Sequence, residues 1–246
     1  MNIISNAPII DPFSGAYGGN NPKYVADAAP RGYFFVFYLG IPETLVKLPE
    51  IKSPINTIPN ISLYLSAMTV NIDGFDTSMG KVTTEGRAGR KQNDATRQDF
   101  PDSVTCTIRE RDGLPIIRIM SAWSNMIADL RTGGRHYNLV AGDTALSTRY
   151  KCKILVAYTK QDYSTLQLAV LYSGCFPDKV PYSAITNQDI TTVDNVPDHN
   201  IGWSFDGVPE FSISNPQIEE MAKSLVTTYR GPIETVRKSL NIDYTK

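Results

Sequence analysis

The sequence has few of the features that define most disulfide-rich, metal-binding and membrane proteins. It contains three cysteines, Cys106, Cys152 and Cys175, an odd number at wide spacing that fits neither a disulfide framework nor a zinc site. Because all three fall within apolar runs, we expect small buried thiols. No uninterrupted apolar run reaches about 18 residues, and the start, MNIISNAPIIDPFSG, lacks a basic leader followed by an apolar stretch. We therefore expect a soluble chain without membrane anchoring.

The sequence also lacks an excess of charge of either sign. Lys and Arg total 24 against 25 Asp and Glu, so the formal net charge is -1. Tight binding to nucleic acid requires many cations that neutralise phosphates, so this balance predicts at most a loose contact with DNA. It also disfavours a single-stranded-DNA-binding barrel, whose affinity would depend strongly on salt.

Motifs for catalysis are missing as well. No G-x-x-x-x-G-K-[ST], G-x-S-x-G or H-E-x-x-H pattern occurs, and EGRAGRKQ offers only G-x-x-G. His136 and His199 lie in turn-like contexts, where we expect solvated or capping side chains. Asp189, Asp194 and Asp198 do not have the spacing of an EF-hand and are typical of turns. We expect no catalytic activity, no metal and no cofactor.

What the chain does contain is a series of segments typical of strands. YFFVFYL, residues 33–39, is apolar on both alternating faces, which a strand tolerates only if both faces are covered. It is therefore expected to be a central or interface strand, with Phe34, Val36 and Tyr38 as interface residues. Apolar and polar residues alternate in LYLSAMTVNIDGF, SVTCTIRERDG, YKCKILVAYTK, LQLAVLYSG and IGWSFDGVPEFSI, which predicts strands with one face in a core. Pro209 in the last of these implies a bulge or an edge position.

Two segments predict helices. Apolar residues recur at three-and-four spacing over residues 114–132, and Pro115 suits the first turn. The second helix is expected over 216–229, with Asn215 as the cap and Pro216 at the first helical position. Because it lies beyond the last strand, we interpret it as an appendage.

The order of these elements predicts the fold class. Strands, then one helix, then strands again indicate a mainly β protein, an antiparallel β-sandwich or barrel with one packed α-helix. We expect three segments: an N-terminal extension (1–30), a β-barrel domain (31–214) and a C-terminal helical extension (215–246).

A polar stretch of some two dozen residues, 76–99, separates two of the strand-like segments. It is longer than usual for a connection, so it is expected to be a functional loop or disordered. It carries five cationic and four anionic side chains, and near-balance favours protein partners over phosphate. The candidate contact residues of this stretch are its charged side chains from residue 81 onwards: Lys81, Glu85, Arg87, Arg90, Lys91, Asp94 and Arg97.

The order of five pieces of the chain resembles a known family. They are GRAGRKQNDATRQDFPDSVTCTIRERDG, a helix with a central Trp123, YKCKILVAYTKQD, LQLAVLYSGCFPDKVPYSAI and DHNIGWSFDG. In this order they resemble the tail tube proteins of contractile-tailed bacteriophages, a family related in fold to the tube proteins of type VI secretion. The resemblance covers about residues 33–213.

The resemblance implies a structural role. Six subunits would form a ring whose strands join into one inner barrel, and rings would stack into a tube that conducts DNA during ejection. The 81–98 segment matches the family's inter-subunit arm, which reaches neighbouring subunits and the next ring. The partners implied are further copies of the chain, sheath and baseplate proteins, and genomic DNA in loose, non-specific contact. The protein would belong to the virion tail and assemble in the cytoplasm of the host bacterium.

The residues themselves favour self-assembly. A small sheet with open edges and a doubly apolar strand leaves surface that identical copies would cover. The polar strand faces, with few cations to retain DNA, form a candidate lumen surface: Thr69, Asn71, Asp73, Thr105 and Thr107. Two alternatives stay open. One is a tube-initiating baseplate or tube-capping protein of the same tail, and the other is an all-β carbohydrate-binding or hydrolase domain.

Overall fold

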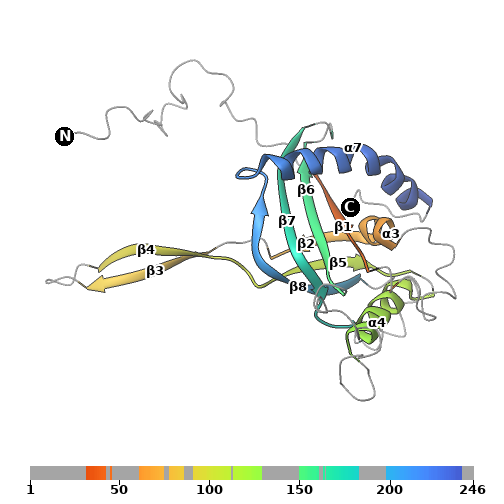
Figure 1. Cartoon of the computed structure of the whole chain (residues 1–246), viewed down its shortest axis with the longest axis horizontal. Helices are drawn as coiled ribbons and strands as arrows, with labels where there is room; N and C mark the ends of the chain where they lie inside the picture. Colours follow the sequence, from red (N-terminus) through yellow and green to blue (C-terminus); the bar gives the residue numbers. More distant parts are fainter. Residues whose placement is uncertain are drawn as a thin grey trace, which may run out of the picture.

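The structure is a computed structural model. It describes residues 32–42, 45, 61–74, 78–85, 91–111, 113–128, 150–160, 163, 165–182 and 198–239. This part of the chain forms a six-stranded antiparallel sheet, a separate two-stranded sheet and three helices longer than one turn (Figure 1). The expected mainly β fold with a packed helix is therefore confirmed.

The large sheet has the strand order β1-β6-β7-β8-β5-β2. Its strands are β1 (Tyr33–Leu39), β2 (Thr69–Asp73), β5 (Ser103–Arg109), β6 (Cys152–Thr159), β7 (Leu166–Pro177) and β8 (Asp198–Phe211). The small sheet pairs β3 (Ser78–Glu85) with β4 (Lys91–Asp99). The helices are α3 (Ile61–Met68), α4 (Pro115–Ile127) and α7 (Pro216–Ser239).

The large sheet curls until its two edge strands approach each other. The Tyr38 hydroxyl on β1 lies 3.1 Å from the Thr69 hydroxyl on β2, so the sheet is a nearly closed barrel. Inside it, the Trp203 ring of β8 packs 5.3 Å from the Tyr38 ring and 5.4 Å from the Trp123 ring of α4. These large buried aromatic side chains join β1, β8 and α4 into one core.

Strand β1 lies at an edge of the sheet, so of the two expectations for residues 33–39, a central strand is wrong and an interface strand stays a prediction. It pairs with β6 alone among the described strands. Both of its faces are nevertheless buried, because α3 packs along it and the Ser62 hydroxyl donates a hydrogen bond to the Tyr38 carbonyl. The doubly apolar pattern thus reflects cover supplied by the chain itself.

The segment predicted as one long strand from Leu63 is divided between two elements. Residues 61–68 form α3, and the strand β2 begins only at Thr69. Tyr64, Leu65 and Met68 are buried at three-and-four spacing, which a helix also satisfies, so the short alternating pattern was not decisive. The Thr69 hydroxyl donates to the Leu65 carbonyl at 2.8 Å and satisfies an acceptor at the helix end.

Helix α4 begins as predicted, with Pro115 in its first turn. It ends at Ile127 rather than at residue 132, because Ala128 already has an extended backbone (φ -146°, ψ 141°). The Trp123 indole N–H donates to the Tyr150 carbonyl at 2.7 Å, which links the helix to the residues just before β6. The glycines expected to stop the helix, Gly133 and Gly134, lie outside the described residues.

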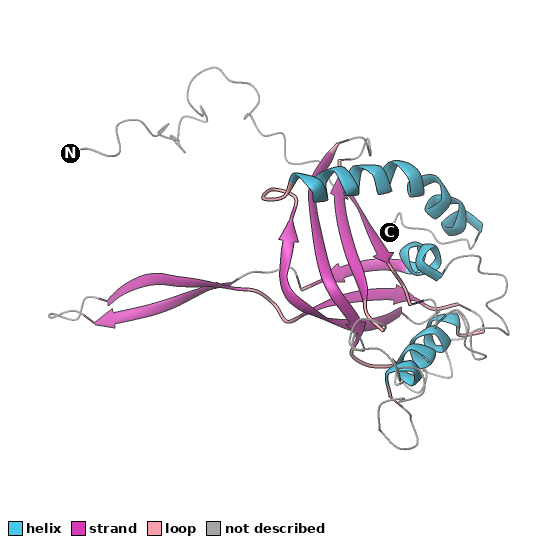
Figure 2. Ribbon diagram, viewed as in Figure 1, coloured by secondary structure: helices cyan, strands magenta, loops and turns pink. Residues whose placement is uncertain are grey.

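Helix α7 is longer than predicted, and it is part of the body rather than an appendage. It packs against β6, β7 and α3, and Figure 2 shows it lying across the strands. The helix was expected to end at residue 229, but it continues to Ser239 with Pro232 inside it. Beyond that point Ile233 is buried and the Arg237 guanidinium donates to the Ala67 carbonyl at 3.2 Å, so packing on α3 offsets the lost backbone hydrogen bond.

The buried stripe of α7 gives a direct test of this role. Val226 is 4% exposed, and replacing it with Ser removes methyl groups from the core and buries a hydroxyl. We expect Val226→Ser to lower the free energy of unfolding by about 2–3 kcal/mol in urea titrations. The control, Thr228→Ser on the exposed face, should change it by less than about 0.5 kcal/mol. Equal, small effects of both variants would contradict the packing of α7 on the body.

Candidate assembly surfaces

The polar stretch expected to be a long loop is largely a β-hairpin. Strands β3 and β4 pair in antiparallel register from Ser78 opposite Asp99 to Glu85 opposite Lys91, with a register shift after Gly80. Figure 1 shows this hairpin, here called the arm, extending away from the large sheet with no helix beside it. The loop prediction was therefore wrong in secondary structure, while the projecting position agrees with an arm.

The structure places the charged arm residues on both strands. Lys81 and Glu85 belong to β3, and Lys91, Asp94 and Arg97 to β4. The remaining two, Arg87 and Arg90, lie outside the described residues. Their inter-subunit role stays a prediction.

A sequence signal for the arm strands was present but weak. The run Val82, Thr83, Thr84 is β-branched, and Gly86 and Gly89 follow it within a few residues, which is typical of a hairpin. The high content of charged and amide side chains outweighed this signal, because so polar a ribbon has no apolar face to bury.

The physics of an isolated hairpin makes the arm a candidate contact surface. A single two-stranded ribbon is marginally stable at best in water, and three or more strands or a packed helix are needed for independent stability. The arm has only two strands, and Figure 2 shows neither a third strand nor a helix packed on it in the described part of the chain. Its two outer edges therefore present backbone donors and acceptors to a further molecule.

The second open surface is the edge of β2, the strand that leads into the arm. Among the described strands β2 pairs only with β5, and its residues Asn71 and Asp73 are exposed. This differs from β1, where Val36 and Tyr38 are 1% and 0% exposed and Phe34 is half-buried. The predicted interface residues Val36 and Tyr38 therefore lie in the core of this chain, and a contact through β1 stays a prediction for its backbone and Phe34.

The predicted lumen residues fall on one polar face, with one exception. Asn71 lies opposite Thr107 and Asp73 opposite Thr105, so these four side chains share the outer face of β2 and β5. Thr69 does not share this face. A bulge at the next residue places Thr69 opposite buried Ile108, and its side chain lies inside the barrel at 1% exposure.

The polar face continues onto β8. The Thr107 hydroxyl donates to the Asn200 side-chain oxygen at 2.8 Å. Arg109 forms a two-point ion pair with Asp198, with N–O distances of 3.0 and 3.3 Å. The charge of Arg109 on this face is thus neutralised by Asp198. The role of the face as a lumen surface stays a prediction.

A buried polar cluster lies where β5 leads into α4, and the sequence did not reveal it. Glu110 is fully buried, and its carboxylate accepts N–H bonds from Arg111, Ile116 and Ile117 at 3.0–3.1 Å. His199, expected in a solvated turn, is instead buried in β8, with Nε2 3.1 Å from the same carboxylate. The carboxylate satisfies the free N–H groups of the first turn of α4 and interacts favourably with the helix dipole. This arrangement is that of a helix cap.

The three cysteines are buried free thiols, as expected. Burial raises the pKa of Cys106 and of Cys175 to about 12, and it also raises the pKa of Cys152. They are protonated at neutral pH and far from the thiolate form that reacts or binds metal. In the described part of the chain, no three His, Cys, Asp or Glu residues gather as metal ligands.

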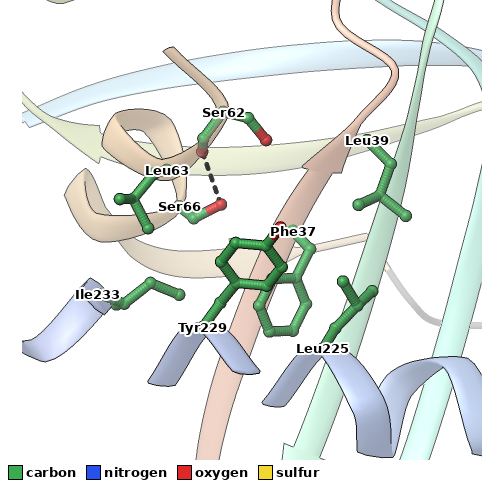
Figure 3. Close-up of a pocket in the computed structure, with 8 residues that line it drawn as sticks. All are labelled: Phe37, Leu39, Ser62, Leu63, Ser66, Leu225, Tyr229 and Ile233. Carbon is green, nitrogen blue, oxygen red and sulfur yellow. Dashed lines mark hydrogen bonds between the residues drawn. The ribbon is translucent and has the colours of Figure 1, made fainter. Parts of the chain in front are cut away.

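Two small cavities lie in the described structure. One, about 90 Å³, lies between α3, β1 and α7 and is lined by Phe37, Leu225, Tyr229 and other mostly apolar side chains (Figure 3). Another, about 60 Å³, lies beside Tyr163 and Lys223. Both are smaller than the roughly 300–1,000 Å³ that is usual for ligand pockets. No described helix has the length and apolar character to cross a membrane.

No protein family model and no curated protein matches the chain. Three solved structures show a limited likeness. The tube-terminating cap of the anti-feeding prophage gives a TM-score of 0.37 at 14% identity, over 58% of this chain and 78% of that chain. The sheath/tube terminator of the PVC extracellular contractile injection system gives 0.40 at 13%, over 72% and 91%. A chain of the PVC sheath-tube complex gives 0.41 at 13%, over 78% and 97%. All three TM-scores lie below 0.5.

Proposed function

We propose that the protein is a structural subunit of a contractile-tail tube. Copies close into hexameric rings, the rings stack, and the lumen conducts DNA during ejection. The observation that carries the proposal is the arm, a two-stranded ribbon that extends from the body and is too small to be stable alone in water. A partner surface explains why such a ribbon is present.

The open edge of β2 adds a second contact surface next to the arm. Exposed sheet edges are usually blocked or covered, since they pair readily with other chains. Identical copies arranged in a closed ring remove such edges without leaving an unpaired end. The six-fold ring and the stacked tube come from the resemblance to tail tube proteins.

The outer face of β2, β5 and β8 suits the lumen of this tube. Thr105, Thr107 and Asn71 are polar, and the cation Arg109 is paired with Asp198. Few free cations mean few counterions released on contact with phosphate, so DNA would slide along the surface rather than bind to it. The proposed partners are further copies of this chain, sheath and baseplate proteins, and DNA in loose contact, all within the virion tail assembled in the bacterial cytoplasm.

A tube-capping or tube-initiating protein of the same tail is the second candidate. It is favoured by α7, which lies beyond the region of the resemblance and packs on β6, β7 and α3 as an addition to the sheet. A subunit in the middle of a tube needs two ring faces that match each other, whereas a cap needs only one.

Purified full-length protein tests the proposal by light scattering after gel filtration and by negative-stain electron microscopy. We expect hexamers and stacked rings at high concentration, with contacts that bury at least about 2,000 Å² each. Single rings that never stack would favour the cap. A monomer that persists at high concentration would contradict both.

A further inference from the structure

The arm is a continuation of the edge ribbon of the barrel. Strand β2 ends at Asp73 and β3 begins at Ser78, while on the return β4 ends at Asp99 and β5 begins at Ser103. Both β2–β5 and β3–β4 are antiparallel pairs. Among the described residues, Gly74 on the outgoing side and Phe100 to Asp102 on the return belong to neither ladder.

Gly74 occupies the interruption on the outgoing strand. Its φ of +93° is a conformation that other L-residues rarely adopt, and an added Cβ would lie 3.0 Å from the Ser103 carbonyl oxygen and 3.3 Å from the Val104 Cα. Both neighbours are backbone atoms of β5, which is held on its other side by β8. The Gly74 N–H also donates to the Asp73 carboxylate at 2.7 Å. The chain turns here in a way that only glycine permits without displacing β5.

Pro101 occupies the interruption on the returning strand. Its ring fixes φ near -65° and leaves no N–H to extend the ladder, and it also restricts Phe100 to extended conformations. Two different features thus mark the junction, with Gly74 beside the start of β5 and Pro101 two residues before that start. One is a backbone turn in close contact with β5, and the other is a rigid residue.

We propose that Gly74 and Pro101 form a fixed joint that sets the direction in which the arm leaves the body, and hence which neighbouring copy the arm meets. The first half concerns a single chain. The second half rests on the proposed function, because it requires a neighbouring copy. A fixed direction lowers the entropy lost when the arm docks, which is the general benefit of a preorganised contact.

Distances between two spin labels test the direction. One label is attached at Thr84→Cys in β3 and the other at Ser224→Cys on the exposed side of α7. The native thiols are buried and protonated, so we expect them not to react, and an unmutated chain treated with the same label is the control. Labelled protein is diluted into unlabelled protein so that only distances within one chain are measured. We expect one narrow distance distribution for the otherwise unmutated chain.

Gly74→Ala should shift the maximum of this distribution by several ångströms or broaden it clearly. The matched control is Gly40→Ala, because Gly40 also has a positive φ, +65°, but an added Cβ there meets nothing within 4 Å. It should leave the distribution unchanged. Pro101→Ala, which adds no atoms, should broaden the distribution even if Gly74→Ala unfolds. An arm with a broad distribution before any change, or one whose distribution neither Gly74→Ala nor Pro101→Ala alters, would overturn the joint.

Microscopy of the same variants separates the two proposals. If the unmutated chain forms stacked rings, Gly74→Ala should reduce stacking at least tenfold at equal concentration while Gly40→Ala stacks normally. Normal stacking of a Gly74→Ala chain with a shifted arm would overturn the claim that the joint selects the neighbour. If the unmutated chain stays monomeric, the proposed function fails. The label distances then still test whether Gly74 and Pro101 fix the direction of the arm.

Discussion

A chain in which a short Gly-Ser linker replaces residues 78–99 is expected to fold and to remain monomeric at concentrations where the full chain assembles. The arm forms a sheet of its own, whereas the core around Trp203 is built by the large sheet and the helices. Its removal should therefore change the midpoint of thermal unfolding by no more than a few degrees. Light scattering measures the loss of assembly, and near-ultraviolet circular dichroism checks the packing of the aromatic core.

Two outcomes of this deletion would contradict the account. If the shortened chain still forms rings and tubes, the arm is dispensable and another surface holds the copies together. If the shortened chain does not fold, the arm is part of the body. A mixture of full and shortened chains sharpens the result, since shortened chains should shorten the tubes by accepting no further ring.

The second large effect is expected at Glu110. Its buried carboxylate is the acceptor for the Ile116 and Ile117 N–H groups and lies 3.1 Å from His199. Glu110→Ala leaves these buried groups without a partner, so we expect the free energy of unfolding to fall by about 3–5 kcal/mol. Guanidinium titration of both proteins measures the difference.

Glu110→Gln is the matched control, because it keeps the shape of the side chain and one acceptor oxygen. We expect it to lose roughly half as much as Glu110→Ala, since one of the helix N–H groups keeps its partner. A loss below about 1 kcal/mol for Glu110→Ala would show that the carboxylate does not cap α4 as the distances indicate.

The strand pattern was the most reliable part of what the sequence predicted. In β5, Val104, Cys106 and Ile108 are buried and the intervening residues are half-exposed, as the alternation indicated. Such a pattern is decisive because one side of a strand faces the core and the other faces outward. The bulge at Pro209 was also foreseen, since β7 and β8 shift register twice and Gly207 has a φ of +76°.

The errors arose where contacts distant in sequence decide the local structure. Strand β1 is apolar on both faces because α3 covers one of them. Helix α7 continues past Pro232 because it packs on α3, and a bulge in β2 places the Thr69 side chain inside the barrel. The helix and strand propensities of single residues carry no information about these contacts. The pairing of Glu110 with His199 spans 89 positions, so no spacing rule could have found it.

These corrections change how assembly is explained. The sequence suggested that a strand with two apolar faces, residues 33–39, needs copies of the chain to cover it, but the chain covers β1 with its own α3. In the described structure the unpaired strand edges are those of β1, β2 and the arm, and the sequences of β2 and the arm are largely polar. We therefore expect contacts dominated by backbone hydrogen bonds, in the manner of strand addition.

Hydrogen–deuterium exchange of the arm, compared between dilute and assembled full-length protein, tests most directly whether another copy stabilises this ribbon. In dilute monomer the arm should be formed most of the time but open often, so amides of residues 78–85 and 91–99 should exchange much faster than those of β6. On assembly they should slow by at least a hundredfold, while amides of β6 stay protected in both states. Slow exchange of the arm in dilute monomer, or equally fast exchange in the assembled protein, would contradict the account.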